Sequence, residues 1–335
     1  MGKMLARIAV LGLSVLLVGC GILPANWGKL EGRAWCDVRY LDTNPKYQNP
    51  ATAGDAFRKR IKLSEEGYIY AVAAVMPLQQ DNDETDFHFT KPNRLKEVFE
   101  LRRNLRNGFD AMTFILHDKD DTPVQTIISF GGSNQKRDYF LHNLWLFPVH
   151  FEDARQYVLD VAANDKTKNL PFIAVGVSLG GGLAVHVRKQ ESTRKFITQA
   201  WAFNPSPRID ANHLLDDQVY LLANEYEILN KLTRDHLGAT AEHTATDFHL
   251  IVSSSIYAHY RWVLTRQILH FADLSLYFKA NRSPALTEPM QILQTQKISE
   301  RVCTPRLKDA IETDRRQREA ERRGIPNIPP PIQNL

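Results

Sequence analysis

The chain has 335 residues, of which 43% are hydrophobic and 24% are charged, and its formal net charge is +4. This length accommodates one large α/β domain with appendages, and so small a net charge argues against a nucleic-acid-binding protein. The sequence contains no C-x-x-C and no H-E-x-x-H motif, so it predicts neither a metal site nor a cofactor.

The first twenty residues have the organisation of a bacterial signal peptide. Lys3 and Arg7 precede an apolar stretch, residues 8–18, that is too short to cross a bilayer comfortably. The stretch ends in Leu-Val-Gly-Cys20, which resembles the lipobox of bacterial lipoproteins. The resemblance implies removal of residues 1–19 and lipidation of Cys20, which would hold the protein durably on a membrane of the cell envelope. A glycine rather than an aspartate after Cys20 favours the outer membrane, and an ordinary secretory peptide or an uncleaved anchor is the alternative.

Residues 20–60 are expected to form a lipidated tether and a peripheral arm, because they show little apolar periodicity and contain several prolines and glycines. Cys36 lies in this arm, and Cys303 lies near the carboxyl end of the chain. In an oxidising compartment these two cysteines could form a disulfide bond. Two isolated buried thiols are equally compatible with the sequence.

The central domain is assigned to residues 61–300. Residues 67–76 are apolar and rich in alanine, which predicts a buried helix, and residues 81–86 form an acidic loop. Two apolar runs, residues 111–116 and 124–130, flank a polar turn and therefore predict a hairpin. Residues 137–163 have a mostly helical pattern that is interrupted near Pro148.

A G-x-S-x-G motif centred on Ser178 lies between an apolar strand, residues 171–175, and a helix that ends near Gln190. In a nucleophile elbow the chain turns sharply from strand to helix, so the positions two before and two after the serine must be nearly bare of side chain. The serine hydroxyl then lies above the carboxyl end of the sheet, near the positive end of the helix. A glycine-rich turn without a catalytic role is the alternative.

Two further strands are predicted at residues 196–203 and 219–223, and one or two long helices at residues 251–280. Because strands alternate with helices after residue 124, we expect an α/β fold with a mainly parallel sheet flanked by helices. The last segment, residues 301–335, is expected to form a charged helix and an extended Pro-rich tail.

Four motifs, in this order along residues 110–275, resemble those of the class 3 (fungal-type, triacylglycerol) lipases, which are α/β-hydrolases. The apolar strand ending at Ser133 is similar to the oxyanion turn of that family, and residues 176–184 are similar to its G-H-S-L-G-G-A-L-A elbow. Residues 202–207 fall where the family has an F-x-x-P turn, and residues 220–229 resemble its strand ending in N-x-x-D-x-V. Here a valine replaces the histidine of the elbow, and a glutamate replaces the aspartate.

Carried over by position, the resemblance implies a catalytic triad. Ser178 would be the nucleophile, and Glu227 would be the acid, with Glu225 as a competitor. A histidine must take the proton of the serine and a carboxylate must hold that histidine, in the chain order Ser, acid, His. His259 fits the position of the base best, and His249 is the second candidate. The N–H of Leu179 and the N–H or hydroxyl of Ser133 would form the oxyanion hole.

These residues predict a membrane-tethered serine esterase with lipase or phospholipase character, which would hydrolyse acyl esters of lipids through an acyl-enzyme. The alternative is a catalytically degenerate, hydrolase-fold envelope lipoprotein that serves as a binding or scaffold protein. Acyl transfer to an alcohol would use the same residues. Residues 81–86 and 238–246 are candidate lids, and neither the acyl chain length, nor the head group, nor the oligomeric state can be predicted.

Overall fold

The computed structural model describes residues 36–37, 39, 41, 54–80, 87–131, 149–231, 234–250, 258–259, 261–283, 285–295, 297–298 and 304–324. Within these residues the main sheet has eight strands in the order β2-β4-β5-β6-β7-β8-β9, with β3 also paired to β4. The strands are β2 (Leu95–Glu97), β3 (Arg103–Asn104), β4 (Asp110–His117), β5 (Pro123–Phe130), β6 (Phe172–Val177), β7 (Ile197–Phe203), β8 (Val219–Asn224) and β9 (Thr244–Phe248).

The sheet is mixed but mostly parallel. Strands β5 to β9 run parallel to one another, whereas β4 pairs antiparallel with β5, and β2 and β3 pair antiparallel with β4. A separate two-stranded ribbon joins β1 (Phe87–His88) to β10 (Lys297–Ile298). This arrangement confirms the predicted α/β class, the hairpin formed by β4 and β5, and the strands now seen as β6, β7 and β8.

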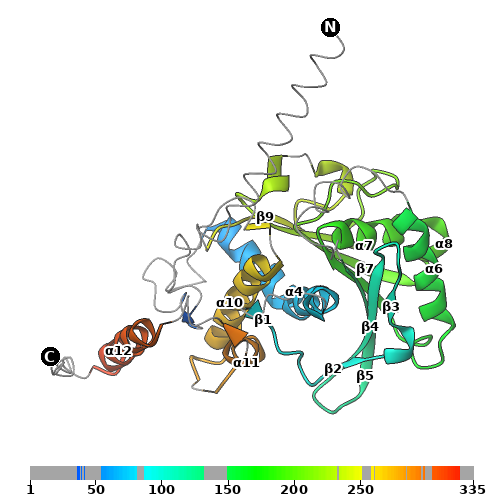
Figure 1. Ribbon diagram of the computed structural model, residues 1–335. Coiled ribbons are helices and arrows are strands. Elements are labelled where there is room, and N and C mark those ends of the chain that lie inside the picture. Colours follow the sequence, from blue (N-terminus) through cyan, green and yellow to red (C-terminus); the bar gives the residue numbers. More distant parts are fainter. Residues whose placement is uncertain are drawn as a thin grey trace, which may run out of the picture.

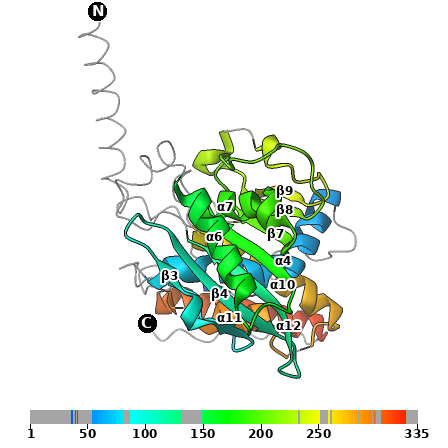
Figure 2. The same ribbon diagram turned by 90° about the vertical axis from the view of Figure 1, so that its right-hand side faces the viewer.

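Helices cover both faces of the sheet (Figures 1 and 2). The helices α4 (Asp55–Gln80), α10 (Arg261–Lys279) and α11 (Glu288–Thr295) lie on one face, and α6 (Val149–Ala163), α7 (Leu179–Lys189) and α8 (Glu191–Arg194) lie on the other. The neighbouring strands β5, β6 and β7 follow one another in sequence. Since parallel crossovers are right-handed, their connecting helices α6 and α7 must pack on the same face.

The hydrophobic cores on the two faces of the sheet follow from the alternation of side chains along each strand. In β6, Ile173 and Val175 join the core beneath α4 and α10, whereas Phe172 and Ala174 join the core beneath α6 and α7. Successive side chains of a strand point to opposite faces of the sheet. A strand buried on both faces therefore has a continuous apolar sequence, as β6 does.

Helix α4 corrects two predicted boundaries. It begins at Asp55 and ends at Gln80, whereas the sequence predicted a helix only at residues 67–76 and a peripheral arm up to residue 60. In its first turns the apolar residues Phe57 and Ile61 are buried among charged neighbours, and this i, i+4 spacing is too short a run to stand out in the sequence. Residues 55–60 therefore belong to a core helix.

Part of the predicted arm is also packed against the domain. Asp37, Arg39 and Leu41 are buried, and Arg39 forms an ion pair with Asp273 of α10 at 3.3 Å. The arm is therefore not peripheral at these residues. Cys36 is disulfide-bonded, and the other two cysteines of the chain lie outside the described residues, so its pairing with Cys303 stays a prediction.

The carboxyl-terminal region contains the predicted charged helix, α12 (Pro305–Arg322), while residues 325–335 lie outside the described part. The described ranges also contain three short 3-10 helices: η4 (Phe99–Leu101), η5 (Ile228–Lys231) and η6 (Asp235–Leu237). None of the helices in the described ranges is both long and apolar enough to span a lipid bilayer. The predicted signal peptide and Cys20 lie outside these ranges, so the lipid anchor stays a prediction.

One candidate lid is excluded by its position. Residues 238–246 lie at the amino end of β8, where Leu221 donates its N–H to His243 O at 2.9 Å and Asp216 bridges to Ala239. The G-x-S-x-G motif follows β6 at the opposite, carboxyl edge of the parallel strands. The other candidate, residues 81–86, lies outside the described residues.

Candidate active site

Ser178 occupies the turn between β6 and α7 in an unusual backbone conformation, with φ 56° and ψ −122°. For a residue with a side chain, such a positive φ costs about 1–3 kcal/mol and persists only when its surroundings hold it. The Ser178 N–H donates to Phe203 O at 3.0 Å, and Ser178 O accepts the N–H groups of Gly182 and Ser206 at 3.2 and 2.9 Å. Bonds to the end of β7, to the turn that follows β7 and to the first turn of α7 therefore fix this turn.

The glycines of the motif are required by close backbone contacts. A Cβ atom on Gly176 would lie 2.2 Å from the carbonyl carbon of Gly180, and a Cβ atom on Gly180 would lie 2.2 Å from Phe130 O. Neither contact can be relieved by rotating a side chain, because the opposing atoms belong to the backbone. The motif thus lets α7 begin directly against the ends of β5 and β6, as its spacing predicted.

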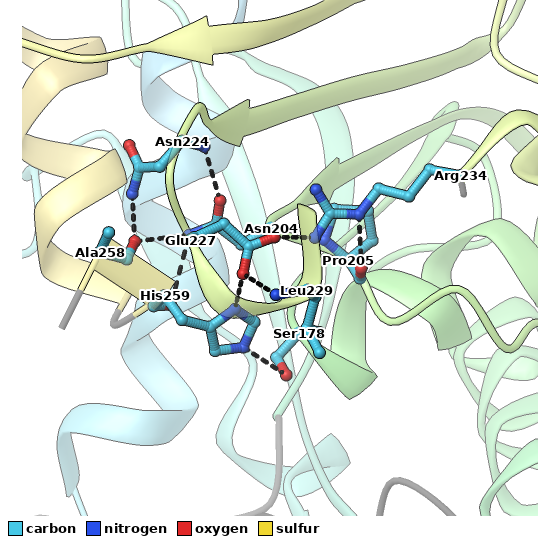
Figure 3. A network of polar contacts seen from close by, with 9 residues as sticks. All are labelled: Ser178, Asn204, Pro205, Asn224, Glu227, Leu229, Arg234, Ala258 and His259. Atoms are coloured by element: carbon cyan, nitrogen blue, oxygen red, sulfur yellow. Dashed lines mark hydrogen bonds and ion pairs between the residues drawn. The ribbon is translucent and has the colours of Figure 1, made fainter. Parts of the chain in front are cut away.

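The structure brings Glu227 and His259 to Ser178 (Figure 3). The Ser178 hydroxyl lies 3.0 Å from His259 Nε2, and His259 Nδ1 lies 2.6 Å from Glu227 Oε2. A carboxylate only accepts hydrogen bonds, so Nδ1 carries the proton and Nε2 is free to accept the proton of the serine. Glu227 and His259 are both buried, whereas Ser178 is half-buried.

Both oxygens of the Glu227 carboxylate are satisfied by donors. Oε2 accepts the Leu229 N–H at 2.8 Å in addition to His259 Nδ1–H, and Oε1 forms an ion pair with Arg234. Burial raises the pKa of Glu227, but the hydrogen bond and charge of His259, the charge of Arg234 and the Leu229 N–H outweigh burial and lower that pKa. The carboxylate is therefore ionised at neutral pH.

Two buried asparagines hold the backbone at His259 (Figure 3). Asn204, directly after β7, donates its side-chain amide to Ala258 O at 3.2 Å and to His259 O at 3.3 Å. Asn224, the last residue of β8, also donates to Ala258 O, and its own N–H donates to Asn204 Oδ1 at 2.9 Å. Gln267 of α10 in turn donates to Asn224 Oδ1. The carboxyl ends of β7 and β8 thereby position the segment that precedes α10.

The competing candidates for the acid and the base lie apart from this arrangement. Glu225 interacts with His249, whose Nδ1 lies 3.5 Å from Glu225 Oε2, and both side chains are more than a third exposed. His249 Nδ1 also lies 2.8 Å from Asp247 O. The contact to His259 Nδ1 comes from Glu227, and the contact to Ser178 Oγ comes from His259.

Of the two expected oxyanion donors, the structure describes one. Leu179 is the first residue of α7, so the helix provides no acceptor for its N–H, and the positive end of the helix dipole lies beside Ser178. Ser133 lies outside the described residues, and its role stays a prediction. Leu179 N–H is thus available to an oxyanion that forms next to Ser178.

Sequence reasoning did not identify Asn204, Asn224 or Arg234 as site residues. The two asparagines carry a recognisable signal, since each lies at the carboxyl end of a parallel strand, where functional side chains of α/β sheets gather. Arg234 carries no such signal, because it follows the acid by seven residues on an irregular segment.

The arrangement can activate a hydroxyl. The imidazole of His259 presents Nε2 3.0 Å from Ser178 Oγ and is placed to take the hydroxyl proton, and a buried carboxylate is placed to stabilise the imidazolium that forms. Within the described ranges, no three or more His, Cys, Asp or Glu side chains are grouped so that they could hold a metal ion. No protein-family model and no curated protein matches the chain, so its function is inferred from the site itself.

Proposed function

We propose that this protein is a serine hydrolase that cleaves acyl esters, with Ser178 as nucleophile, His259 as general base and Glu227 as the acid that orients the histidine. The proposal is carried by one observation: the 3.0 Å and 2.6 Å contacts that link these three side chains. The strained conformation of Ser178 supports it, because such strain gathers at sites where the chain must present a reactive group.

In the proposed reaction Ser178 Oγ attacks the carbonyl carbon of the ester while His259 Nε2 takes the hydroxyl proton. The N–H of Leu179 stabilises the oxyanion, which is worth several kcal/mol in related arrangements. His259 then gives its proton to the departing alcohol, which leaves Ser178 acylated. A water molecule, deprotonated by His259, hydrolyses the acyl-enzyme and restores the serine.

We further propose that the fold is an α/β-hydrolase fold similar to that of the class 3 lipases. Support comes from the mostly parallel sheet, the elbow between β6 and α7, and an acid after β8 followed by a histidine before α10. The sequence adds the expectation of a lipid anchor at Cys20, which would bring the enzyme to a membrane surface where acyl substrates are concentrated. This combination favours lipid or phospholipid esters as substrates.

A serine-directed fluorophosphonate tests the proposal. The wild type should be labelled, and Ser178→Ala should not be, because the variant lacks the attacking oxygen. Hydrolysis of p-nitrophenyl esters should fall by about 10⁴-fold or more in Ser178→Ala, since members of a triad act as a unit. Ser129→Ala is the matched control, because Ser129 is a buried serine of β5 that donates to Ala73 O and lies outside the site.

Labelling of both Ser178→Ala and the wild type would contradict the proposal, as would a folded wild type that neither reacts nor hydrolyses any acyl ester. The second result would favour the alternative role as a binding or scaffold lipoprotein. Circular dichroism of each protein establishes that the fold is intact.

A further inference from the structure

Glu227 and Arg234 form an ion pair that is removed from solvent, next to the proposed base. The Arg234 side chain is 6% exposed, and the Glu227 side chain is 0% exposed. A triad needs a carboxylate to orient its histidine, and it does not need a cation on that carboxylate. A buried ion pair also contributes little net stability, because an apolar pair of similar volume often stabilises the folded protein equally well. The arginine at this position therefore requires a functional explanation.

Arg234 connects the acid to the nucleophile through the turn after β7. Its Nε–H donates to Pro205 O at 3.0 Å, while its Nη2 contacts Glu227 Oε1. The next residue of the turn, Ser206, donates its N–H to Ser178 O at 2.9 Å. In Figure 3 the guanidinium lies on the side of the carboxylate away from His259. It can hold Glu227 in place without entering the path of the reacting proton.

We propose that Arg234 is a positioning residue of the triad, which orients Glu227 and keeps the Glu227–His259 pair free of an additional proton at mildly acidic pH. This inference rests on the proposed function. A fixed positive charge beside the carboxylate makes a second positive charge on His259, or a proton on Glu227, less favourable. Because the two groups are strongly coupled, they take up that proton as a unit.

The charges around the pair are consistent with this role. Burial raises the pKa of Glu227, and the interactions with His259, Arg234 and Leu229 N–H together lower it. Burial lowers the pKa of Arg234, but a guanidinium remains protonated at any pH at which the protein is active. Of the other charged or titratable side chains on the described elements around the pair, Glu225 faces His249 and His236 of η6 contacts Pro207 O. Asp247 pairs with Arg60, and Arg266 of α10 is near Asp37.

The sign of the pH effect follows directly. The active form of the pair carries no additional proton, so activity falls as the pH drops through the point of protonation. Without the positive charge of Arg234 the pair accepts its proton at a higher pH. The acid limb of the pH profile of kcat/KM should therefore move upward, by about one pH unit for the loss of one nearby charge.

The test compares two neutral variants, Arg234→Gln and Arg234→Met, with the charge-retaining Arg234→Lys. The readout is the rate constant of fluorophosphonate labelling as a function of pH, together with kcat/KM for an ester that the wild type hydrolyses. The midpoint of the labelling rate constant reports on the site where the folded fraction is constant over the pH range, and circular dichroism of each variant at every pH measures that fraction. We expect an upward shift of about one pH unit in both neutral variants and little shift in Arg234→Lys.

Arg188→Gln is the matched control. Arg188 forms a comparably buried ion pair with Asp216, at 3.0 Å, with side chains 12% and 11% exposed. It lies near the end of α7, about 14 Å along the helix from its first residue. Removing its charge should leave the acid limb unchanged.

If the wild type is active and the acid limb of both neutral variants lies at the same pH as that of the wild type, the role of Arg234 is overturned and the proposed function stays intact. An upward shift in Arg188→Gln as large as that in Arg234→Gln would overturn it as well. A wild type that is inert toward the fluorophosphonate and toward esters would instead remove the proposed function itself.

Discussion

Ser178 has a positive φ, and the glycines on either side of it explain how the chain tolerates this conformation. A methyl group on Gly176 would collide with the backbone of Gly180, and a methyl group on Gly180 would collide with the backbone of Phe130. The motif therefore specifies a backbone conformation, and the position of the Ser178 hydroxyl follows from that conformation. The sequence predicts this turn well, because the contacts that shape it are made by the residues of the motif and by the ends of the adjacent strands.

Gly176→Ala should disrupt the turn. The added Cβ would lie 2.2 Å from the carbonyl carbon of Gly180, and relief requires the start of α7 to move away from β6. Overpacking of this kind typically costs about 1–3 kcal/mol and occasionally more. We expect a lower midpoint in urea denaturation and slower fluorophosphonate labelling of the folded protein.

Gly54→Ala is the control for that substitution. Gly54 directly precedes α4, and a Cβ atom added there would meet nothing within 4 Å. The stability should change by no more than about 0.5 kcal/mol. Equal denaturation midpoints for the wild type and Gly176→Ala would contradict the steric account of the motif.

At the scale of elements, the site lies where β6, β7 and β8 end and where α10 is about to begin. The nucleophile follows β6, Asn204 follows β7, and Asn224 ends β8. The side chains of these two asparagines hold the carbonyls of Ala258 and His259, so the strands determine where the histidine stands. Positioning of this type matters because a displacement of about 1 Å can slow a reaction by about 10²-fold.

Asn204→Asp should impair the base, and it should also lower the stability, because the new carboxylate is buried without a cation. Asparagine and aspartate both tolerate the positive φ of this residue, 42°, and the new side chain can still accept the Asn224 N–H. It cannot donate to the carbonyls of Ala258 and His259. We expect kcat to fall by roughly 10–100-fold with little change in KM, as measured by steady-state ester hydrolysis.

Asn281→Asp provides the matched control. Asn281 also has a positive φ, 51°, but it lies in an exposed turn after α10, far from the carboxyl edge of the sheet. Its substitution should leave kcat unchanged. A kcat for Asn204→Asp equal to that of the wild type would show that the asparagine does not position His259.

At the scale of the whole molecule, Asp37 and Arg39 of the amino-terminal arm contact the last two long helices, α10 and α12. Arg39 is buried, its Nε lies 3.3 Å from Asp273 Oδ2, and its guanidinium lies 3.7 Å from the centre of the Tyr277 ring. Asp37 forms an ion pair with Arg315 of α12 at 2.9 Å. Through these two residues the chain links α10 to the charged carboxyl-terminal helix.

Arg39→Ala should destabilise the protein without changing the chemistry of the site. The substitution leaves the carboxylate of Asp273 buried without its cation, which costs about 3 kcal/mol in comparable ion pairs. Asp273 lies about 18 Å along α10 from the first residue of that helix, so kcat of the folded enzyme should be retained. Urea denaturation and ester hydrolysis measure the two effects separately.

Arg58→Ala serves as the comparison, because the side chains of the Arg58–Asp55 ion pair are 51% and 94% exposed. Exposed pairs contribute about 0–1 kcal/mol, so the free energy of unfolding should hardly change. An equal effect of both substitutions would mean that the arm does not contribute to the stability of the domain.

The sequence by itself determined the class of the fold, the hairpin of β4 and β5, most of the parallel strands and the turn at Ser178. These features depend on local patterns: the alternation or continuity of apolar residues along a strand and the absence of side chains beside the serine. The first turns of α4 were missed. A few apolar residues among charged ones do not predict a buried helix, because their burial depends on which other surface of the folded protein covers them.

Only the tertiary structure decided which acid and which histidine meet Ser178. His259 lies 81 residues from the serine and 32 residues from Glu227 along the chain, and Glu225 and His249 are as suitable chemically. The choice depends on how β8 pairs with β7 and on how Asn204 and Asn224 hold the segment before α10, and no local pattern specifies these contacts. The same holds for Arg234, because the partner of a buried charge is set by which segments meet in the folded protein.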